Sequence, residues 1–208
     1  GQLIAIVRDF KPPHADFETF NDGLQRGLVS PTLDADKLPV RADVKGSQLA
    51  SAASFAQWYR DTPGVNQRFE IPLTLKQESP GVFAFENNKF FPIDGMGFGN
   101  YAKDRQGVDR NFHFTTEIRG RFKYQGGEVF TFKGDDDVWV FVNGKLGLDL
   151  GGVHGVQTDT LRFDEKAAEL GIEKGKTYTL DVFHAERHTH ASNFRMETSI
   201  ECLAVEIL

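Results

Sequence analysis

Apolar and polar residues alternate over much of the chain. The clearest alternating segment is Phe112–Tyr124, and shorter ones are Phe69–Leu75, Tyr178–Val182 and Phe194–Ile200. A period of two places successive side chains on opposite faces of a strand. Antiparallel sheets that cover a core on one face show this alternation. The pattern therefore predicts antiparallel strands, with one buried and one wet face for Phe112–Tyr124.

A second kind of strand is predicted near the middle of the second half of the chain. Val138–Val142 is apolar without interruption, which is typical of a strand buried on both faces. The next two residues, Asn143-Gly144, form the dipeptide that best adopts the two positive φ angles of a type I′ turn. Lys145–Leu150 then resumes with leucine at every second position. The sequence predicts a β-hairpin whose register is set by its turn.

Helical spacing is rare in this sequence. A helix is predicted over Ser51–Arg60, with Ser51 or Ser47 as its N-cap. Its aromatic residues recur at i, i+3 and i+4, which is more often core packing than a ligand site; they are Phe55, Trp58 and Tyr59. A second short helix is predicted over Asp164–Leu170. Residues 14–45, rich in Asp, Gly and Pro, are expected to cross the surface as a long loop.

The composition agrees with β structure. Phenylalanine occurs 19 times among 208 residues, whereas methionine occurs twice, and aromatic residues favour strands. A chain of this length commonly forms one β-sandwich. We therefore expect residues 1–208 to be a single all-β domain, an antiparallel two-sheet β-sandwich with a few short helices in long loops.

Charge and cysteine content limit the partners. A formal net charge of −6 disfavours nucleic acid, which requires a basic face. No apolar run approaches the roughly 18 residues of a membrane span, so membrane insertion is not expected. Cys202 is the single cysteine and leaves no internal disulfide. No pattern predicts an oligomeric state.

Three consecutive aspartates precede the buried strand. Asp135, Asp136 and Asp137 follow Gly134, where like charges would repel unless a cation lies between them. Calcium takes roughly six to eight oxygen ligands, chiefly carboxylates and carbonyls. Asn193, in a later histidine-rich loop, would add an amide oxygen, and sugar hydroxyls would complete the coordination shell. The alternative is that an Asp-rich turn is simply a solvated strand end.

The histidine-rich loop allows a different metal. His188 and His190 are two residues apart and would share one face of a strand, with His184 or Glu186 nearby. Imidazole suits zinc or copper. The alternative is that these histidines order a polar loop by hydrogen bonding.

Hydrolysis would require two opposed carboxylates, and Asp136 with Glu186 is the pair that the sequence offers. No Gly-x-Ser-x-Gly elbow, His-Glu-x-x-His helix or phosphate-binding loop is present. Without a positioned acid and base, the chain is not expected to be an enzyme.

Over almost its whole length the chain resembles the fibro-slime domain, a branch of the calcium-dependent lectin domains named for the anthrax protective antigen. The resemblance rests on seven segments: Ile6–Phe10, Ser54–Asp61, Phe91–Gly95, Asn111–Glu117, Gly134–Lys145, Asp149–His154 and Phe183–His188. It implies a two-sheet β-sandwich found in extracellular adhesins, flocculins, toxins and appendages of glycoside hydrolases.

In the lectin members, two consecutive aspartates joined by a cis peptide bond bind calcium, and the calcium binds vicinal hydroxyls of a terminal sugar. Alignment on Asn143-Gly144 places this pair on Asp135-Asp136, with Asp137 where many relatives carry glycine. Asp136-Asp137 is the alternative pair. The resemblance further implies that Asn193 and the main chain of residues 187–190 supply the remaining ligands.

The resemblance thus implies a calcium-dependent carbohydrate-binding lectin or adhesin module of a cell-surface or secreted protein, which binds glycans or polysaccharide through its calcium. The implied metal ligands are Asp135, Asp136 and Asn193. The implied carbohydrate contacts are Asp135, Asp136, Asp137, Arg187, His188 and His190. The alternative is a structural adhesin module in which calcium only stabilises loops, because a ligand that binds the folded state stabilises it.

Overall fold

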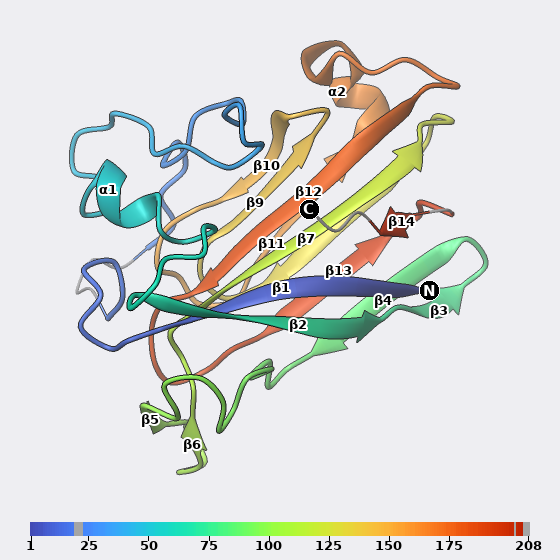
Figure 1. The fold of residues 1–208 in the computed structure, drawn as a ribbon. Helices are drawn as coiled ribbons and strands as arrows, with labels where there is room; N and C mark the ends of the chain where they lie inside the picture. The colour runs from blue at the N-terminus through green and yellow to red at the C-terminus, as the bar shows by residue number, and fades with distance from the viewer. Residues whose placement is uncertain (19–22, 202, 206–208) are drawn as a thin grey trace.

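A computed structural model describes residues 1–18, 23–201 and 203–205. Within these ranges the chain forms two large antiparallel sheets, one two-stranded sheet and two short helices (Figure 1). The two large sheets face each other, which confirms the all-β, two-sheet sandwich. The predicted long loop over residues 14–45 carries two isolated bridges, Val29 with Arg41 and Thr32 with Lys145. Its residues 19–22 lie outside the described ranges, as does Cys202.

The larger sheet has seven strands in the order β10-β9-β12-β7-β1-β2, with β14 also paired to β7. Its strands are β1 (Gln2–Phe10), β2 (Asn66–Thr74), β7 (Phe114–Lys123), β9 (Val138–Val142), β10 (Lys145–Leu150), β12 (Thr177–Glu186) and β14 (Ala204–Val205). β2 contains Pro72 and lies at the edge of this sheet, where a residue without an N–H is tolerated.

The smaller sheet has five strands in the order β11-β8-β13-β4-β3. Its strands are β3 (Lys76–Ser79), β4 (Val82–Asn87), β8 (Val129–Gly134), β11 (Gln157–Arg162) and β13 (Phe194–Thr198). The third sheet is the hairpin of β5 (Ala102–Lys103) and β6 (Asp109–Arg110), and the helices are α1 (Ala52–Phe55) and α2 (Phe163–Leu170). The helix predicted over Asp164–Leu170 is thus confirmed.

The main core lies between the two large sheets. Phe114 and Phe122 from the larger sheet meet Phe130, Phe132 and Phe194 from the smaller one, and all five are almost completely buried. The abundance of phenylalanine is explained by this layer, because aromatic side chains bury the largest apolar area per residue.

The predicted hairpin is confirmed. β9 is buried along its whole length and pairs with β10 from Val142 and Lys145 onward. Asn143 and Gly144 have φ angles of 54° and 71°, as a type I′ turn requires. A register shift between Leu146 and Leu148 interrupts the predicted alternation.

The prediction of a wet face on β7 is wrong for most of the strand. Seven consecutive residues from Phe114 are buried, because a second apolar layer covers the outer face of the larger sheet. This layer consists of Leu28, Val29, Leu38, Leu49, Phe55, Trp58 and Tyr59, packed on Trp139, Phe141, Phe183 and Ala185. It comes mainly from the long loop over residues 14–45 and from the segment around α1, which lie over this sheet in Figure 1.

Charged side chains remain under this layer because they pair with one another. Arg8 donates to Glu117 at 2.7 Å, and Arg119 donates to Glu117 at 2.6 Å and to Asp181 at 3.1 Å. Buried charges of this kind are stable only when they are paired and hydrogen-bonded.

The helix predicted over Ser51–Arg60 is shorter than expected. Ser51 caps it as predicted, through a 2.9 Å bond from the Ser54 amide, but the helix ends at Phe55. After Ala56 the hydrogen-bond pattern changes, because the Gln57 and Trp58 amides donate to the carbonyls three residues back, those of Ser54 and Phe55. The carbonyls of the next turn are then taken up by side chains: the Asn66 amide group donates to Gln57 and Arg60, and the Thr115 hydroxyl donates to Trp58.

Trp58→Ala tests the outer layer. Trp58 is fully buried, packs on Phe55 and Trp139, and donates its indole N–H to Asp16 at 3.0 Å. We expect the free energy of unfolding in urea to fall by about 3–5 kcal/mol, as for other large-to-small changes of buried aromatic residues. Val156→Ala, at an exposed position, is the control and should change it by less than about 0.5 kcal/mol. Equal losses in the two variants would show that this layer does not stabilise the fold.

Candidate functional site

Two loops meet at one end of the sandwich. The aspartate loop (residues 135–137) joins β8 to β9, and the second loop (residues 187–193) joins β12 to β13. Gly134 is paired with Phe194, and a Cβ on Gly134 would lie 2.2 Å from the Asn193 carbonyl oxygen. Glycine is therefore required for the close approach of the loops.

Asp135 is bonded to the second loop. Its Oδ2 accepts from the Asn193 amide at 3.0 Å and from Asn193 Nδ2 at 2.6 Å, whereas Oδ1 accepts no hydrogen bond from the described residues. Burial raises the pKa of Asp135, although the bonds from Asn193 and the charges of His154 and Arg105 oppose this effect. The site thus holds Asp135 and Asn193 together, as the sequence predicts.

Asp136 lies deeper and adopts a left-handed conformation, with a φ of 44°. Its two oxygens accept from main-chain amides, those of His154 at 3.2 Å and Arg187 at 2.8 Å. Burial and the neighbouring charge of Asp137 raise the pKa of Asp136 to about 7. Two anionic carboxylates at this depth are unfavourable without a counter-charge.

Asp137 already has its counter-charge. Its Oδ2 lies 3.0 Å from Arg187 Nη1, and both side chains are 0% exposed. The Arg187 guanidinium also donates to the main-chain oxygens of Asp16 and Gln48. The prediction that Asp137 and Arg187 contact carbohydrate is not supported, because neither side chain reaches the surface. The same ion pair argues against Asp136-Asp137 as the alternative metal-binding pair.

The structure also contradicts the cis peptide bond that the resemblance implies. The bonds that join Asp135, Asp136 and Asp137 are trans, and the chain bends there through the left-handed conformation of Asp136. Among the described residues, the cis peptide bond joins Thr189 to His190.

Glu186 is a third acid beside this pair. Its carboxylate is 1% exposed, and neither oxygen has a hydrogen-bonding partner of normal geometry. Burial, followed by the charge of Asp136, raises the pKa of Glu186 well above its usual value, and the charge of Asp135 adds to the rise, whereas the Ser192 hydroxyl and the His188 amide oppose it. A buried carboxylate without a partner is costly unless it is neutralised.

The three histidines of this region do not converge. His184 is fully buried among phenylalanine rings. His188 and His190 lie in the second loop, not on a strand, and their Nδ1 atoms contact the Thr189 and Lys103 carbonyls at 2.5 and 2.9 Å. In the part of the chain that the structure describes, no group of three or more His, Cys, Asp and Glu side chains is arranged to hold a metal ion. The geometry therefore does not support a zinc or copper site here.

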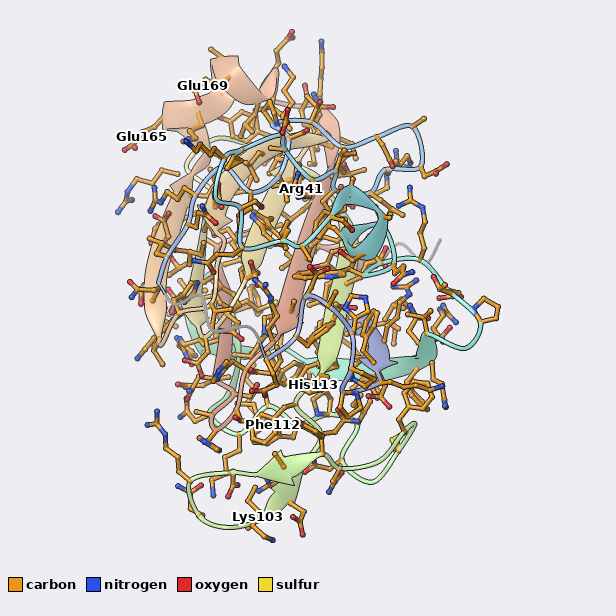
Figure 2. The ribbon with its side chains drawn as sticks, turned by 90° about the vertical axis from the view of Figure 1, so that its left-hand side faces the viewer. Arg41, Lys103, Phe112, His113, Glu165 and Glu169 are labelled. Atoms are coloured by element: carbon orange, nitrogen blue, oxygen red, sulfur yellow. The ribbon has the colours of Figure 1, made fainter. Side chains whose placement is uncertain are left out.

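Two further segments border the second loop, and no local pattern in the sequence predicts either of them. Glu18 accepts from the Thr189 amide at 3.0 Å and contacts His113 Nε2 at 3.2 Å. The hairpin of β5 and β6 contributes the Lys103 carbonyl, and Figure 2 shows Lys103 on this hairpin below His113. These contacts join residues that are far apart in the chain, which is why local pattern cannot reveal them.

The PA14 domain model matches residues 101–206, slightly more than half of the chain. The chain belongs to the PA14 domain family. It is 40% identical over 211 residues to protein psiQ of Dictyostelium discoideum, a match that covers 96% of this chain and 21% of psiQ. It is 38% identical over 210 residues to protein psiD of the same organism, a match that covers 95% of this chain and 41% of psiD.

The chain thus spans between about a fifth and two fifths of the length of these two relatives. Among solved structures, it is similar to one described as a PA14 sugar-binding domain from an RTX adhesin. The identity is 13%, the TM-score is 0.39, and the match covers 100% of this chain and 94% of the other. None of the helices described in the structure is long and apolar enough to cross a membrane.

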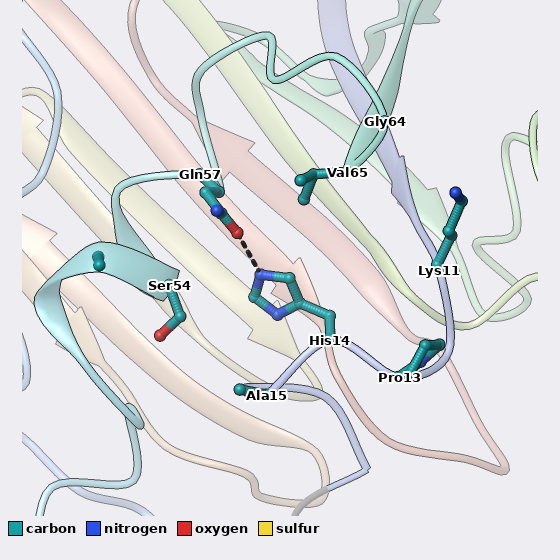
Figure 3. Close-up of a pocket in the computed structure, with 9 residues that line it drawn as sticks. Lys11, Pro13, His14, Ala15, Ser54, Gln57, Gly64 and Val65 are labelled. Carbon is teal, nitrogen blue, oxygen red and sulfur yellow. Dashed lines mark hydrogen bonds between the residues drawn. The ribbon is translucent and has the colours of Figure 1, made fainter.

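The PA14 domain also has a cavity of about 380 Å³ beside α1 (Figure 3). It is lined by Lys11, Pro13, His14, Ala15, Ala53, Ser54, Gln57, Gly64 and Val65. Both ring nitrogens of His14 are already bonded, one to the Gln57 side chain and the other to the Asp16 amide. With no carboxylate in its lining, this cavity lacks the oxygen donors of the acidic site.

Arg187→Met tests the buried ion pair of the PA14 domain. Removing one partner leaves Asp137 as an uncompensated buried charge, so we expect the free energy of unfolding in urea to fall by about 3–5 kcal/mol. Adding Asp137→Asn should recover part of this loss. Arg26→Met is the control, because Arg26 pairs with Asp159 at the exposed surface, and it should cost at most about 1 kcal/mol. A loss that Asp137→Asn leaves unchanged would show that charge is not the cause.

His184 predicts a loss of stability in acid. Burial and then the charge of His154 lower its pKa from 6.5 to about 3, so the unfolded chain binds this proton at a higher pH than the folded domain does. Stability therefore falls as pH drops below about 6.5, by about 2 kcal/mol at pH 5 from this group alone. His184→Phe should reduce the difference between urea unfolding at pH 7 and pH 5. The same pH dependence in wild type and variant would contradict this assignment.

Proposed function

We propose that this PA14 domain binds carbohydrate through a calcium ion held by Asp135, Asp136 and Asn193. The observation that carries the proposal is a group of buried acids without a basic partner at the end of the sandwich. Three acids, Asp135, Asp136 and Glu186, lie buried together, and the buried arginine beside them, Arg187, is bound to Asp137. A divalent cation is the counter-charge that such a cluster favours.

The donor chemistry fits a hard cation. Carboxylate oxygens of Asp135 and Asp136 and the amide oxygen that Asn193 carries are the ligand types that calcium takes in proteins. Asp135 Oδ1 is free of hydrogen bonds from the described residues, and the two unpartnered oxygens of Glu186 would gain from a positive charge nearby. Because no three acidic, histidine or cysteine side chains among the described residues are arranged to hold a metal ion, main-chain oxygens and ligand hydroxyls would have to complete the shell.

Calcium, when bound, would supply coordination positions for vicinal sugar hydroxyls. The domain's own residues would do the rest: the Asp137–Arg187 pair fixes both loops, and the second loop presents side chains beside the ion. His190 is exposed, and the side chain of His188 is 40% exposed. Of the predicted carbohydrate contacts, these two histidines can therefore reach a ligand at the surface directly. Asp135 and Asp136 would act on the ligand through the ion.

The finer parts of this proposal follow the resemblance. We assign the chain to the fibro-slime branch and place it, as a non-enzymatic module spanning residues 1–208, in a longer extracellular or cell-surface protein that binds glycans or polysaccharide. Burial supports the absence of catalysis by Asp136 and Glu186, because a hydrolytic pair must face the substrate from both sides of the bond.

The second candidate is a structural adhesin module. Its support is that Asp135 and Asp136 are almost buried, so an ion there would link the aspartate loop to the second loop even without a sugar. Such an ion would stabilise the folded state by mass action.

Asp135→Asn and Asp136→Asn test the calcium site that both candidate functions require, and glycan binding measured on the same proteins distinguishes the two functions. Each variant removes a ligand charge at constant volume, so we expect calcium affinity in titration calorimetry to fall by about 100-fold or more. Calcium-dependent binding on a glycan array should be lost as well. Asp36→Asn, at an exposed surface position, is the matched control and should change neither.

Each result has one interpretation. Glycan binding that survives a chelator rejects the calcium mechanism. Calcium binding and thermal stabilisation without any glycan binding would favour the structural module. One zinc or copper ion per chain in elemental analysis, with no calcium, would overturn both.

A further inference from the structure

The hairpin of β5 and β6 is a rigid border of the acidic site. Its Lys103 carbonyl contacts His190 in the second loop at 2.9 Å, and the ring of Tyr101 lies 4.5 Å from that of His113. At its turn, Asp104 Oδ1 accepts from the Gln106 and Val108 amides, both at 2.9 Å. The hairpin is thus held to the second loop at its base and ordered at its turn. Figure 1 shows this hairpin below the large sheets, where β12 ends and β13 begins.

Arg105 lies in this turn and differs from the other basic residues of the hairpin. Lys103 pairs with Asp109 at 2.9 Å, and Arg110 pairs with both Asp94 and Asp104. Arg105 is exposed and has no ion pair with any residue that the structure describes. A side chain with five N–H donors is therefore available at the border of the site.

The position of Arg105 relative to the acids follows from contacts of its hairpin. Lys103, two residues earlier, contacts the loop that carries Asn193, and Asn193 is bonded to Asp135. Arg105 is therefore carried by a hairpin whose base borders the loop that is bonded to the acidic cluster.

We propose that Arg105 makes this site selective for anionic saccharides, those that carry a carboxylate or a sulfate group beside the hydroxyls held at the acidic cluster. This inference rests on the proposed function. An anionic group between Arg105 and a cation held by Asp135 and Asp136 would be attracted by both. Guanidinium suits carboxylate and sulfate because it donates two parallel hydrogen bonds. A neutral sugar would engage the cation alone.

The test compares matched saccharides in calcium. The domain of residues 1–208 is presented with neutral hexosides, the corresponding uronates and the corresponding 6-sulfates, so that the two sources of charge are separated. We expect one anionic series to bind about fivefold more tightly than its neutral partner, the upper end of what an exposed charge pair contributes. This preference should decrease as salt increases.

Arg105→Gln should abolish the preference while it leaves neutral binding intact, and Arg105→Lys should keep only part of it because lysine lacks the paired donors. Calcium affinity in Arg105→Gln should be equal or higher, since a repelling charge is removed. Arg162→Gln is the control. Arg162 is the last residue of β11 and lies opposite Val129, at the end of β8 that is away from Gly134 and the aspartate loop. It directly precedes α2, whose Glu165 lies far from Lys103 in Figure 2.

The outcomes separate this inference from the function on which it rests. Equal binding of neutral and anionic saccharides in calcium, or an anionic preference that persists in Arg105→Gln, overturns the role of Arg105 and leaves the calcium-dependent lectin standing. Absence of calcium-dependent binding to every saccharide overturns both.

Discussion

The ion pair between Asp137 and Arg187 is the interaction on which the site depends. Both side chains are completely buried, so the charges can be stable only through each other and through the carbonyls and amides around them. Arg187 is bound to the main chain of Asp16 and Gln48 and lies over the ring of Trp58, while the Gly152 amide donates to Asp137. One guanidinium thereby joins the aspartate loop, the second loop and the outer layer.

This arrangement divides three neighbouring aspartates between two tasks. Asp137 is neutralised and becomes part of the core, and that leaves Asp135 and Asp136 with only main-chain amides and one asparagine as partners. Glu186, whose oxygens have no hydrogen-bonding partner among the described residues, is a third buried acid at the same place. Groups that are left unsatisfied in an otherwise well-packed domain are expected where function requires them. In this domain, the buried acids at one end of the sandwich are such unsatisfied groups.

Features that depend on neighbouring residues could be predicted from the sequence. The type I′ turn follows from Asn143-Gly144 alone, and the short helix before Gly171 follows from local pattern. The grouping of Asn193 with the aspartate loop was expected from the oxygen donors of the two loops and again from the resemblance. Features set by distant contacts were missed: most of β7 is buried on both faces because the layer formed by the long loop of residues 14–45 and the segment around α1 covers it. The helix after Ser51 was also predicted too long, because its amides change to bonds three residues back after Ala56.

The same distinction explains the error at Arg187. In the sequence it stands beside two histidines in a polar loop, where an arginine is normally exposed. Its burial depends on Asp16 and Gln48, which come from a segment more than 100 residues earlier.

The site therefore belongs to the whole chain, although the PA14 match begins only at residue 101. Glu18 holds the Thr189 amide, and the carbonyls of Asp16 and Gln48 hold Arg187, so the N-terminal half supplies the contacts that fix the second loop. The hairpin of β5 and β6 then closes the other side through Lys103 and His190. The acids lie just before β9 and at the end of β12, whereas the residues that fix the loops around them come from the first 50 residues of the chain. The position of the acidic cluster therefore depends on the packing of the outer layer against the larger sheet. Stability of that layer and binding at the site are for this reason coupled properties of one structure.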